Sequence, residues 1–152
     1  ALPDAGSDRL TAEDITDADM ATLRSNFGQK GDKVDVVVFA APQLSIVEMQ
    51  QVAELARGQT FTVPVLVCTA PQVYPDAVRM KLVEAIENAG GKVLQGTCFY
   101  NQYAREIGQA NGWTRLLSNS AKIVNILGGY GYQPALASME DCIASAVTGE
   151  IV

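Results

Sequence analysis

Residues 34–40 read VDVVVFA, a nearly unbroken run of β-branched and other apolar side chains. A run of this kind is typical of a strand that is buried on both faces of a parallel sheet. Directly after it, Ser45 and Glu48 have the spacing of a capping box, which predicts a helix that Gly58 ends. The next apolar run, over residues 63–69, predicts a second strand. This strand–helix–strand order is typical of a crossover connection within a parallel sheet.

The same alternation continues toward the C-terminal end of the chain. Strands that alternate with helices fold into a parallel sheet with helices packed on both of its faces. The sequence therefore predicts an α/β fold over residues 34–152, a three-layer αβα domain with a mostly parallel sheet. The further elements that we expect are a helix over 75–86, a strand over 92–98, a helix over 102–110, a strand over 114–117, an apolar run over 122–127 and a helix over 138–147.

Residues 1–33 form a polar N-terminal segment with one short helix. Thr16 and Asp19 have the spacing of a capping box, which predicts that this helix begins there and ends at Gly28. The first residues contain neither the basic nor the apolar part of a signal peptide, so we expect a soluble, cytoplasmic protein. Because the chain does not begin with Met, we also expect it to be a fragment of a longer protein.

The composition excludes several classes of partner and chemistry. The chain has 152 residues, 48% of them hydrophobic and 18% charged, which is typical of one folded globular domain. Its net charge of -6 argues against nucleic acid as a partner, because such binding depends on Lys and Arg contacts to phosphates. No apolar run reaches the length that a membrane helix needs. The sequence contains no histidine, which excludes Ser-His and Cys-His nucleophiles and His-ligated zinc within this chain.

Four hydrogen-bonding residues follow the strand expected over 114–117. Ser118, Asn119, Ser120 and Lys122 lie between two apolar runs. Ligands of open α/β sheets bind beyond the carboxyl ends of the strands, so these side chains are candidates for a binding site. The alternative is a turn in which short polar side chains bond to their own backbone, with Lys122 an ordinary exposed lysine. The nearby glycine-containing segment over 128–132 lacks the spacing of a nucleotide loop, and we expect a structural hairpin there.

Three cysteines are too few for a disulfide framework, and an odd number cannot all be paired. Cys68 lies inside an apolar strand and is expected in the core. Cys98 ends its strand beside polar residues and is a candidate metal ligand. Cys142 lies in the first turn of the last helix, where the helix dipole favours a thiolate and therefore a soft metal. Packing of Cys142 against the sheet is the alternative.

Four segments of the sequence together resemble the aconitase X family. The stretches SNSAKIVNILGGYG and SMEDCIASAVTG resemble the end of the catalytic part of that family, in which T-N-S-A-K is followed by a glycine-containing loop and a helix with a cysteine. VDVVVFAAPQLSIVEMQQVAELARG and GGKVLQGTCFY resemble an earlier strand, turn and helix of the family and its strand that ends in D-T-C. The order and spacing of these segments agree along nearly the whole chain from Val34 onward.

The resemblance implies an α/β domain of a hydro-lyase, an enzyme that removes water from a small hydroxy acid. Family members act on cis-3-hydroxy-L-proline in one branch and on mevalonate 5-phosphate in another. The family also implies an iron–sulfur cluster that three cysteines hold, of which Cys98 and Cys142 correspond to two. The third cysteine and a swivelling small domain belong to parts of the enzyme outside this chain. We therefore expect the isolated chain to be inactive without its remaining catalytic region.

In this picture Ser118, Asn119, Ser120 and Lys122 supply hydrogen-bond donors to a substrate carboxylate, and the catalytic base is not identified. The sequence departs from the family at residues 40–43, where AAPQ replaces G-C-P-H, and after Lys122, where the usual H-Y is absent. These departures suggest either a divergent substrate, for which we expect the cis-3-hydroxy-L-proline branch, or a family member that has lost activity. The alternative is a non-catalytic, flavodoxin-like domain that binds a small anion at the same strand ends without a metal.

Overall fold

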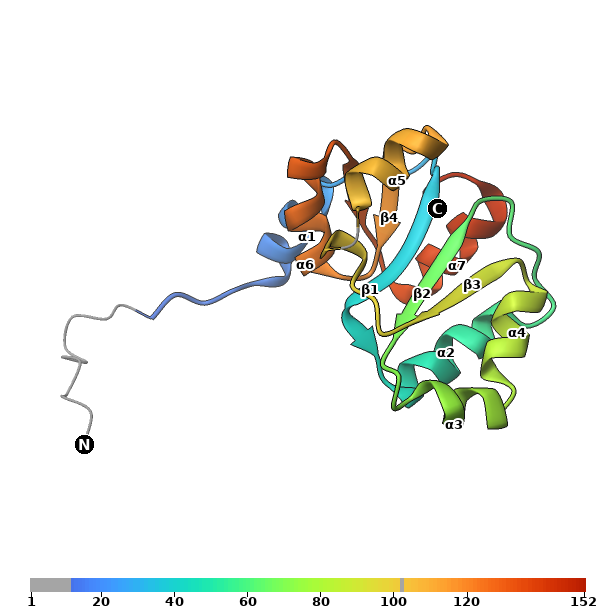
Figure 1. Ribbon diagram of the computed structural model, residues 1–152. Helices are drawn as coiled ribbons and strands as arrows, with labels where there is room; N and C mark the ends of the chain where they lie inside the picture. Colours follow the sequence, from blue (N-terminus) through green and yellow to red (C-terminus); the bar gives the residue numbers. More distant parts are fainter. Residues whose placement is uncertain (1–11, 102) are drawn as a thin grey trace.

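A five-stranded sheet forms the centre of the computed structural model, which describes residues 12–101 and 103–152 (Figure 1). All four strand pairings are parallel, and the strand order is β3-β2-β1-β4-β5. This arrangement confirms the predicted α/β class with a parallel sheet. The strands are β1 (Val36–Leu44), β2 (Val65–Thr69), β3 (Gly91–Gln95), β4 (Arg115–Ser118) and β5 (Gln133–Leu136).

Helices cover both faces of this sheet, which gives the three predicted layers (Figure 1). One face packs against α2, α3, α4 and α7, and the other packs against α5, α6 and the turn η2. A further helix, α1, precedes β1. The helices and turns are α1 (Asp17–Ser25), α2 (Ile46–Ala56), α3 (Tyr74–Arg79), α4 (Leu82–Asn88), η2 (Phe99–Asn101), α5 (Ala104–Asn111), α6 (Ala121–Leu127), η3 (Gly128–Tyr130) and α7 (Met139–Thr148).

Strand β1 is buried on both faces, as its run of β-branched residues predicts. Val37 and Phe39 belong to the core cluster beneath α2, α4 and α7. Val36 and Val38 belong to the cluster on the opposite face, beneath α5 and α6. Because alternate side chains of a strand point to opposite faces, these two clusters lie on the two sides of the sheet. All four side chains are fully buried.

The helix expected over 75–86 is in fact two helices, α3 and α4. Lys81 separates them in a left-handed conformation with φ of 62°, which a continuous right-handed helix does not contain. The strand expected over 92–98 ends earlier, at Gln95, because Gly96 turns the chain with φ of 68°.

The apolar run over 122–127 forms helix α6 and not a strand. Ser120 caps this helix, and its hydroxyl accepts a hydrogen bond from the Ile123 amide. The hairpin expected over 128–132 is also absent from the described chain. A short 3₁₀ turn, η3, occupies its beginning, and Gln133 then begins β5, a parallel edge strand that the sequence analysis did not identify.

The predicted N-terminal capping box is present. The Thr16 hydroxyl accepts from the Asp19 amide, and the Asp19 carboxylate accepts from the Thr16 amide. Helix α1 has no buried residue, while Gly28 after it lies so close to Ala135 that an added Cβ would be 2.9 Å from the Ala135 Cβ. The start of the polar segment, residues 1–11, lies outside the described residues, as does Gln102, the first residue of the helix expected over 102–110. The helices that the structure describes are too short or too polar to span a membrane.

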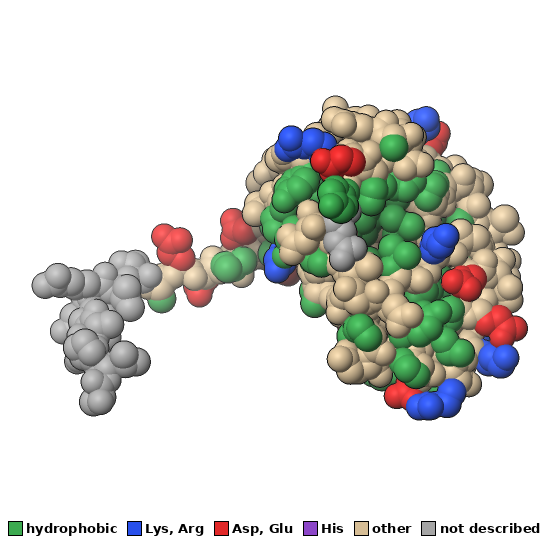
Figure 2. All heavy atoms as spheres, viewed as in Figure 1, with side chains coloured by type: hydrophobic (Ala, Val, Ile, Leu, Met, Phe, Trp, Pro, Cys, Tyr) green, Lys and Arg blue, Asp and Glu red, His purple; other side chains and the backbone are tan. Residues whose placement is uncertain are grey.

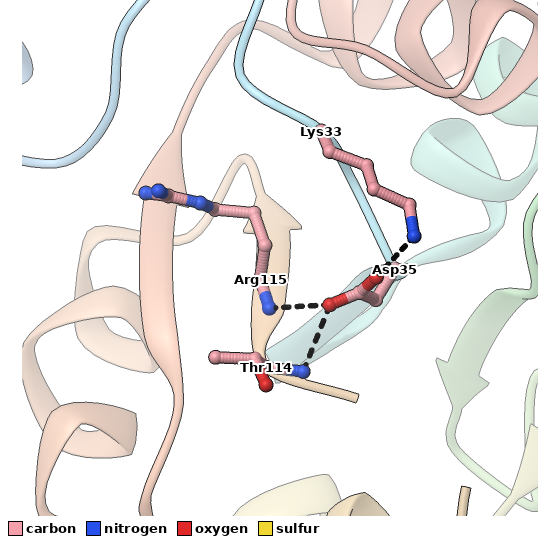
Figure 3. Close-up of polar contacts among 4 residues, drawn as sticks. All are labelled: Lys33, Asp35, Thr114 and Arg115. Atoms are coloured by element: carbon pink, nitrogen blue, oxygen red, sulfur yellow. Dashed lines mark hydrogen bonds and ion pairs between the residues drawn. The ribbon is translucent and has the colours of Figure 1, made fainter. Parts of the chain in front are cut away.

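A carboxylate joins the amino ends of β1 and β4 (Figure 3). The Asp35 Oδ2 atom accepts hydrogen bonds from the amides of Thr114, at 2.9 Å, and Arg115, at 2.8 Å. The Asp35 amide in turn donates to the Arg115 carbonyl, and Lys33 Nζ lies 3.6 Å from Asp35 Oδ1. Desolvation raises the pKa of Asp35, but the two amides and Lys33 together outweigh it and hold this pKa below its usual value.

Charged side chains are interspersed on the face of the molecule drawn in Figure 2. Blue basic and red acidic side chains alternate there with hydrophobic ones, and they form no broad basic area on that face.

Candidate functional site

The candidate site lies where β1 and β4 run side by side. From β1 the chain moves outward through β2 to β3, and it then returns to the other side of β1 to form β4 and β5. Such a reversal of strand order leaves a crevice beyond the carboxyl ends of the two central strands, where ligands of α/β proteins bind. A cavity of about 350 Å³ lies at this position. Its walls are Ala40, Ala41, Pro42, Leu44, Glu48, Asn119, Ser120, Ala121 and Lys122.

The wall from β1 is an irregular part of that strand, where the pairing with β2 shifts register between Phe39 and Leu44. Ala41 has a left-handed backbone with φ of 51°, and the peptide bond that follows, to Pro42, is cis. Gln43 lies in this part of β1, and its Nε2 atom donates to the Thr97 carbonyl at 2.8 Å. This irregular part of β1 is thereby attached to the segment after β3. Non-glycine residues with such backbone angles concentrate at functional sites.

The hydroxyl protons of Ser118 and Ser120 are directed to carbonyls of β1, although Ser120 lines the cavity. Ser118 is fully buried, and its hydroxyl donates to the Val38 carbonyl at 2.7 Å. The Ser120 hydroxyl donates to the Ala41 carbonyl at 2.7 Å. A serine hydroxyl has one proton to donate, so neither side chain has a donor left for an anion. This corrects the expectation that both serines bind the substrate carboxylate.

Asn119 and Lys122 are the two candidates that remain available at the cavity. Asn119 is half-buried in the cavity wall, between the two serines. Lys122 is exposed in the first turn of α6, and its Nζ atom lies 5.5 Å from the centre of the Tyr100 ring. The acid at the cavity, Glu48, is engaged elsewhere, because its Oε2 atom accepts from the Ser45 amide and hydroxyl. The site therefore offers an amide and an ammonium group to a ligand.

Sequence reasoning did not single out Tyr100. The contact between Tyr100 and Lys122 joins residues that are distant in the sequence. No local pattern signals such a pair. The available signal was the position of Tyr100 two residues after the strand expected over 92–98.

Cys142 lies in the hydrophobic core. It is fully buried and belongs to the cluster with Val37, between the sheet and helices α2 and α7. Burial, and then the charges of Asp141 and Glu140, raise the pKa of the Cys142 thiol well above its usual range. Cys142 therefore packs against the sheet, which was the alternative to a metal ligand. The helix dipole would favour the thiolate, but desolvation favours the neutral thiol and outweighs the dipole.

Cys98 lies in a different place from Cys142. It is half-buried in the segment after β3. Its neighbour Thr97 has its Oγ1 atom 3.7 Å from the Sγ of Cys68, a buried residue of the cluster on the α5 and α6 face. As expected, Cys68 is a core residue.

The two cysteines that the resemblance assigns to an iron–sulfur cluster lie apart in this structure. Within residues 12–101 and 103–152 no group of three or more Cys, His, Asp or Glu side chains is placed to hold a metal ion. Cys142 is sealed on one face of the sheet, whereas Cys98 follows an edge strand and adjoins the opposite face. As folded here, only Cys98 is accessible enough to contribute a thiolate.

Comparison with known proteins places these features in a family. The model of the aconitase X third domain matches residues 34–148. The chain belongs to the aconitase X family. This confirms the resemblance that the sequence shows. The crystal structure of aconitase X from Thermococcus kodakaraensis, in its holo-form, has a similar fold, with a TM-score of 0.72 and 22% identity over 87% of this chain and 33% of that one.

Three relatives of this aconitase X domain are named phosphomevalonate dehydratase large subunit. The protein from Thermococcus kodakarensis is 25% identical over 146 residues, which are 94% of this chain and 36% of the relative. The Methanothermobacter thermautotrophicus protein is 27% identical over 85% of this chain and 31% of its own length. The Methanocaldococcus jannaschii protein is 29% identical over 60% of this chain and 22% of its own length. The chain thus spans about a third or less of each relative.

Proposed function

We propose that this chain is the third domain of a dehydratase, a hydro-lyase that removes water from a small hydroxy acid. The observation that carries the proposal is the cavity between β1 and β4, with Asn119 and Lys122 in its wall. Its volume of about 350 Å³ lies near the lower end of the range for small-molecule sites, about 300–1,000 Å³. Membership of the aconitase X family supports this reaction class.

The two available side chains are suited to an anionic group of the substrate. The Lys122 ammonium supplies positive charge and hydrogen-bond donors to a carboxylate or phosphate, and the Asn119 amide supplies further donors. The alanine and leucine side chains in the wall provide an apolar surface for the carbon skeleton. Since Glu48 is engaged in its capping box, we expect the base that removes the substrate proton in the remaining catalytic region.

The names of the relatives favour a phosphorylated hydroxy acid over the expected cis-3-hydroxy-L-proline. All three relatives described above are called phosphomevalonate dehydratase large subunits. Their greater length and the term large subunit support the expectation of a remaining catalytic region and a separate small domain as partners. An iron–sulfur cluster in that assembly would draw on Cys98 at most from this chain, because Cys142 is buried.

The first test is binding of small anions to the 152-residue chain. We expect phosphomevalonate to bind more tightly than cis-3-hydroxy-L-proline in calorimetric titration, and Lys122→Gln to weaken this binding about tenfold through loss of one charged contact. Lys92→Gln is the matched control, because it removes the same charge from an exposed position on β3. Equal affinities of the two variants would contradict the proposed site.

The second test is dehydration by the assembled enzyme. We expect the chain to have no activity alone and to support dehydration of phosphomevalonate only together with the remaining catalytic region and small domain. The alternative, a non-catalytic domain that binds an anion, is favoured by the burial of Cys142. It predicts binding to the cavity without turnover of either hydroxy acid, whichever partner regions are added.

A further inference from the structure

The ammonium group of Lys122 lies against an aromatic ring from a different part of the chain. Lys122 is in the first turn of α6, and Tyr100 is in the 3₁₀ turn η2 that follows β3. The distance from Lys122 Nζ to the centre of the Tyr100 ring is 5.5 Å. Cations within about 6 Å of a ring centre are attracted by the negative face of the ring.

Both partners are attached to well-packed parts of the fold. Phe99, beside Tyr100, is buried, and its ring lies 6.1 Å from that of Tyr132 in the same core cluster. The amide of Asn101 donates to the Cys98 carbonyl, which closes the turn that presents Tyr100. Tyr100 itself is half-buried and packs against this cluster, so the fold restricts the position of its ring before any ligand binds.

The positive charge of Lys122 is not neutralised by a nearby acid. In the part of the chain that the structure describes, no carboxylate forms an ion pair with Lys122. Glu48, across the cavity, accepts from Ser45 and lies in the first turn of α2. The contact with the ring thus holds the ammonium in place and leaves its charge free for an anion.

We propose that Tyr100 is a positioning residue, whose ring holds the Lys122 ammonium at the cavity so that an anionic ligand binds to a group already in place. This proposal rests on the proposed function of the cavity. A lysine side chain is flexible, and ordering it on binding reduces affinity. Because the ring already restricts the Lys122 side chain in the free protein, less entropy is lost when an anion binds. The role requires the aromatic face of Tyr100 and not its hydroxyl, so Phe should replace Tyr at this position and Leu should not.

The first experiment tests the contact in the ligand-free chain. NMR of selectively labelled lysine measures the chemical shift of the ε-methylene protons, which lie beside the ring and are shifted upfield by it. We expect this upfield shift for Lys122 in the wild-type chain and in Tyr100→Phe, and its loss in Tyr100→Leu. Absence of the shift in the wild-type chain would overturn the proposal without any variant, so the result does not depend on the folding of Tyr100→Leu.

The second experiment measures affinity with phosphomevalonate as the probe. We expect Tyr100→Leu to bind it about two- to fivefold more weakly than the wild type, the range for a cation–ring contact at a partly exposed site, and Tyr100→Phe to bind it equally well. Equal weakening by both substitutions would overturn the proposal, because the hydroxyl and not the ring would then matter. If the wild-type chain binds no anion, the proposed function fails, while the NMR measurement still decides whether Tyr100 positions Lys122.

Discussion

The carboxylate of Asp35 should make a measurable contribution to stability, which Asp35→Asn would reduce. Its Oδ2 atom accepts two amide hydrogen bonds at the start of β4, and the Asp35 side chain is 20% exposed. Hydrogen bonds to charged groups contribute about 1.5–3 kcal/mol each, against about 1 kcal/mol for neutral ones. Asn retains an acceptor oxygen but loses the charge. The Thr114 amide is exposed and water can replace its partner, so we expect a loss of about 1–2 kcal/mol at pH 7.

Lys33 adds little to this estimate. Its side chain is 85% exposed, and exposed ion pairs contribute about 0–1 kcal/mol. Lys33→Met should therefore change the free energy of unfolding less than Asp35→Asn does. If Lys33→Met has the smaller effect, the stability that Asp35→Asn removes comes from the two amide hydrogen bonds of Asp35 and not from its ion pair with Lys33.

The effect of Asp35→Asn should depend on pH in one direction only. The fold holds the pKa of Asp35 below its usual value, so the charged form is the one that stabilises the protein. The contribution is then fully present above the unfolded pKa of Asp, about 3.9, and is lost as the pH falls through the lower pKa of the folded state. Wild type and Asp35→Asn should differ most near neutral pH and converge in acid.

Urea unfolding followed by circular dichroism, repeated from pH 7 to pH 3, measures this difference. Asp14→Asn is the matched control, because Asp14 is exposed and lies outside every described helix and strand. Its free energy of unfolding should stay within about 0.5 kcal/mol of the wild type. Equal stability of Asp35→Asn and wild type at pH 7, or a difference that persists unchanged at pH 3, would refute the reasoning.

Three further predictions concern the core and the site. Ser118→Ala removes a buried hydroxyl that bonds to β1, and chemical denaturation should show a loss of about 1–3 kcal/mol, while unchanged stability would contradict the structural role of this residue. Gly108→Ala would place a Cβ 2.6 Å from the Tyr132 hydroxyl, so we expect a net loss of stability despite the better helix propensity of Ala, and a raised melting temperature would argue against this contact. Iodoacetamide should label Cys98 in the native chain and Cys142 only after unfolding, as peptide mass spectrometry can measure; comparable labelling of both would contradict the burial of Cys142.

Elements with strong local signals could be predicted from the sequence. The run of β-branched residues identified β1, and the Ser45–Glu48 capping box identified the start of α2, where both of its hydrogen bonds are present. These signals act between residues that are neighbours in the chain. The apolar run over 122–127, which forms most of α6, was ambiguous because six residues are too few to separate a helical from a strand period. Strand β5 is short and contains a proline, which weakens its strand signal.

The candidate site was harder to predict because its hydrogen bonds are not local. The sequence identified the segment after β4, but the partners of Ser118 and Ser120 are carbonyls of β1, which precedes them by about eighty residues in the chain. The environment of Cys142 also depends on contacts that the sequence does not reveal. Its position in the first turn of α7 follows from the sequence, whereas its orientation into the core depends on how α7 packs on the sheet. Tertiary packing decided its pKa and accessibility.

The polar residues after β4 divide into two groups with different physical roles. The hydroxyls of Ser118 and Ser120 bond to β1, and they tie the carboxyl ends of the two central strands together at the point where strand order reverses. Those bonds fix the backbone from which Asn119 and Lys122 extend to the cavity. A binding group that is fixed before its ligand arrives loses less entropy on binding. The serine hydroxyls thus position the neighbouring amide and ammonium groups, and of the three polar residues after β4 that line the cavity, Asn119 and Lys122 are the two whose side-chain donors are not directed to β1.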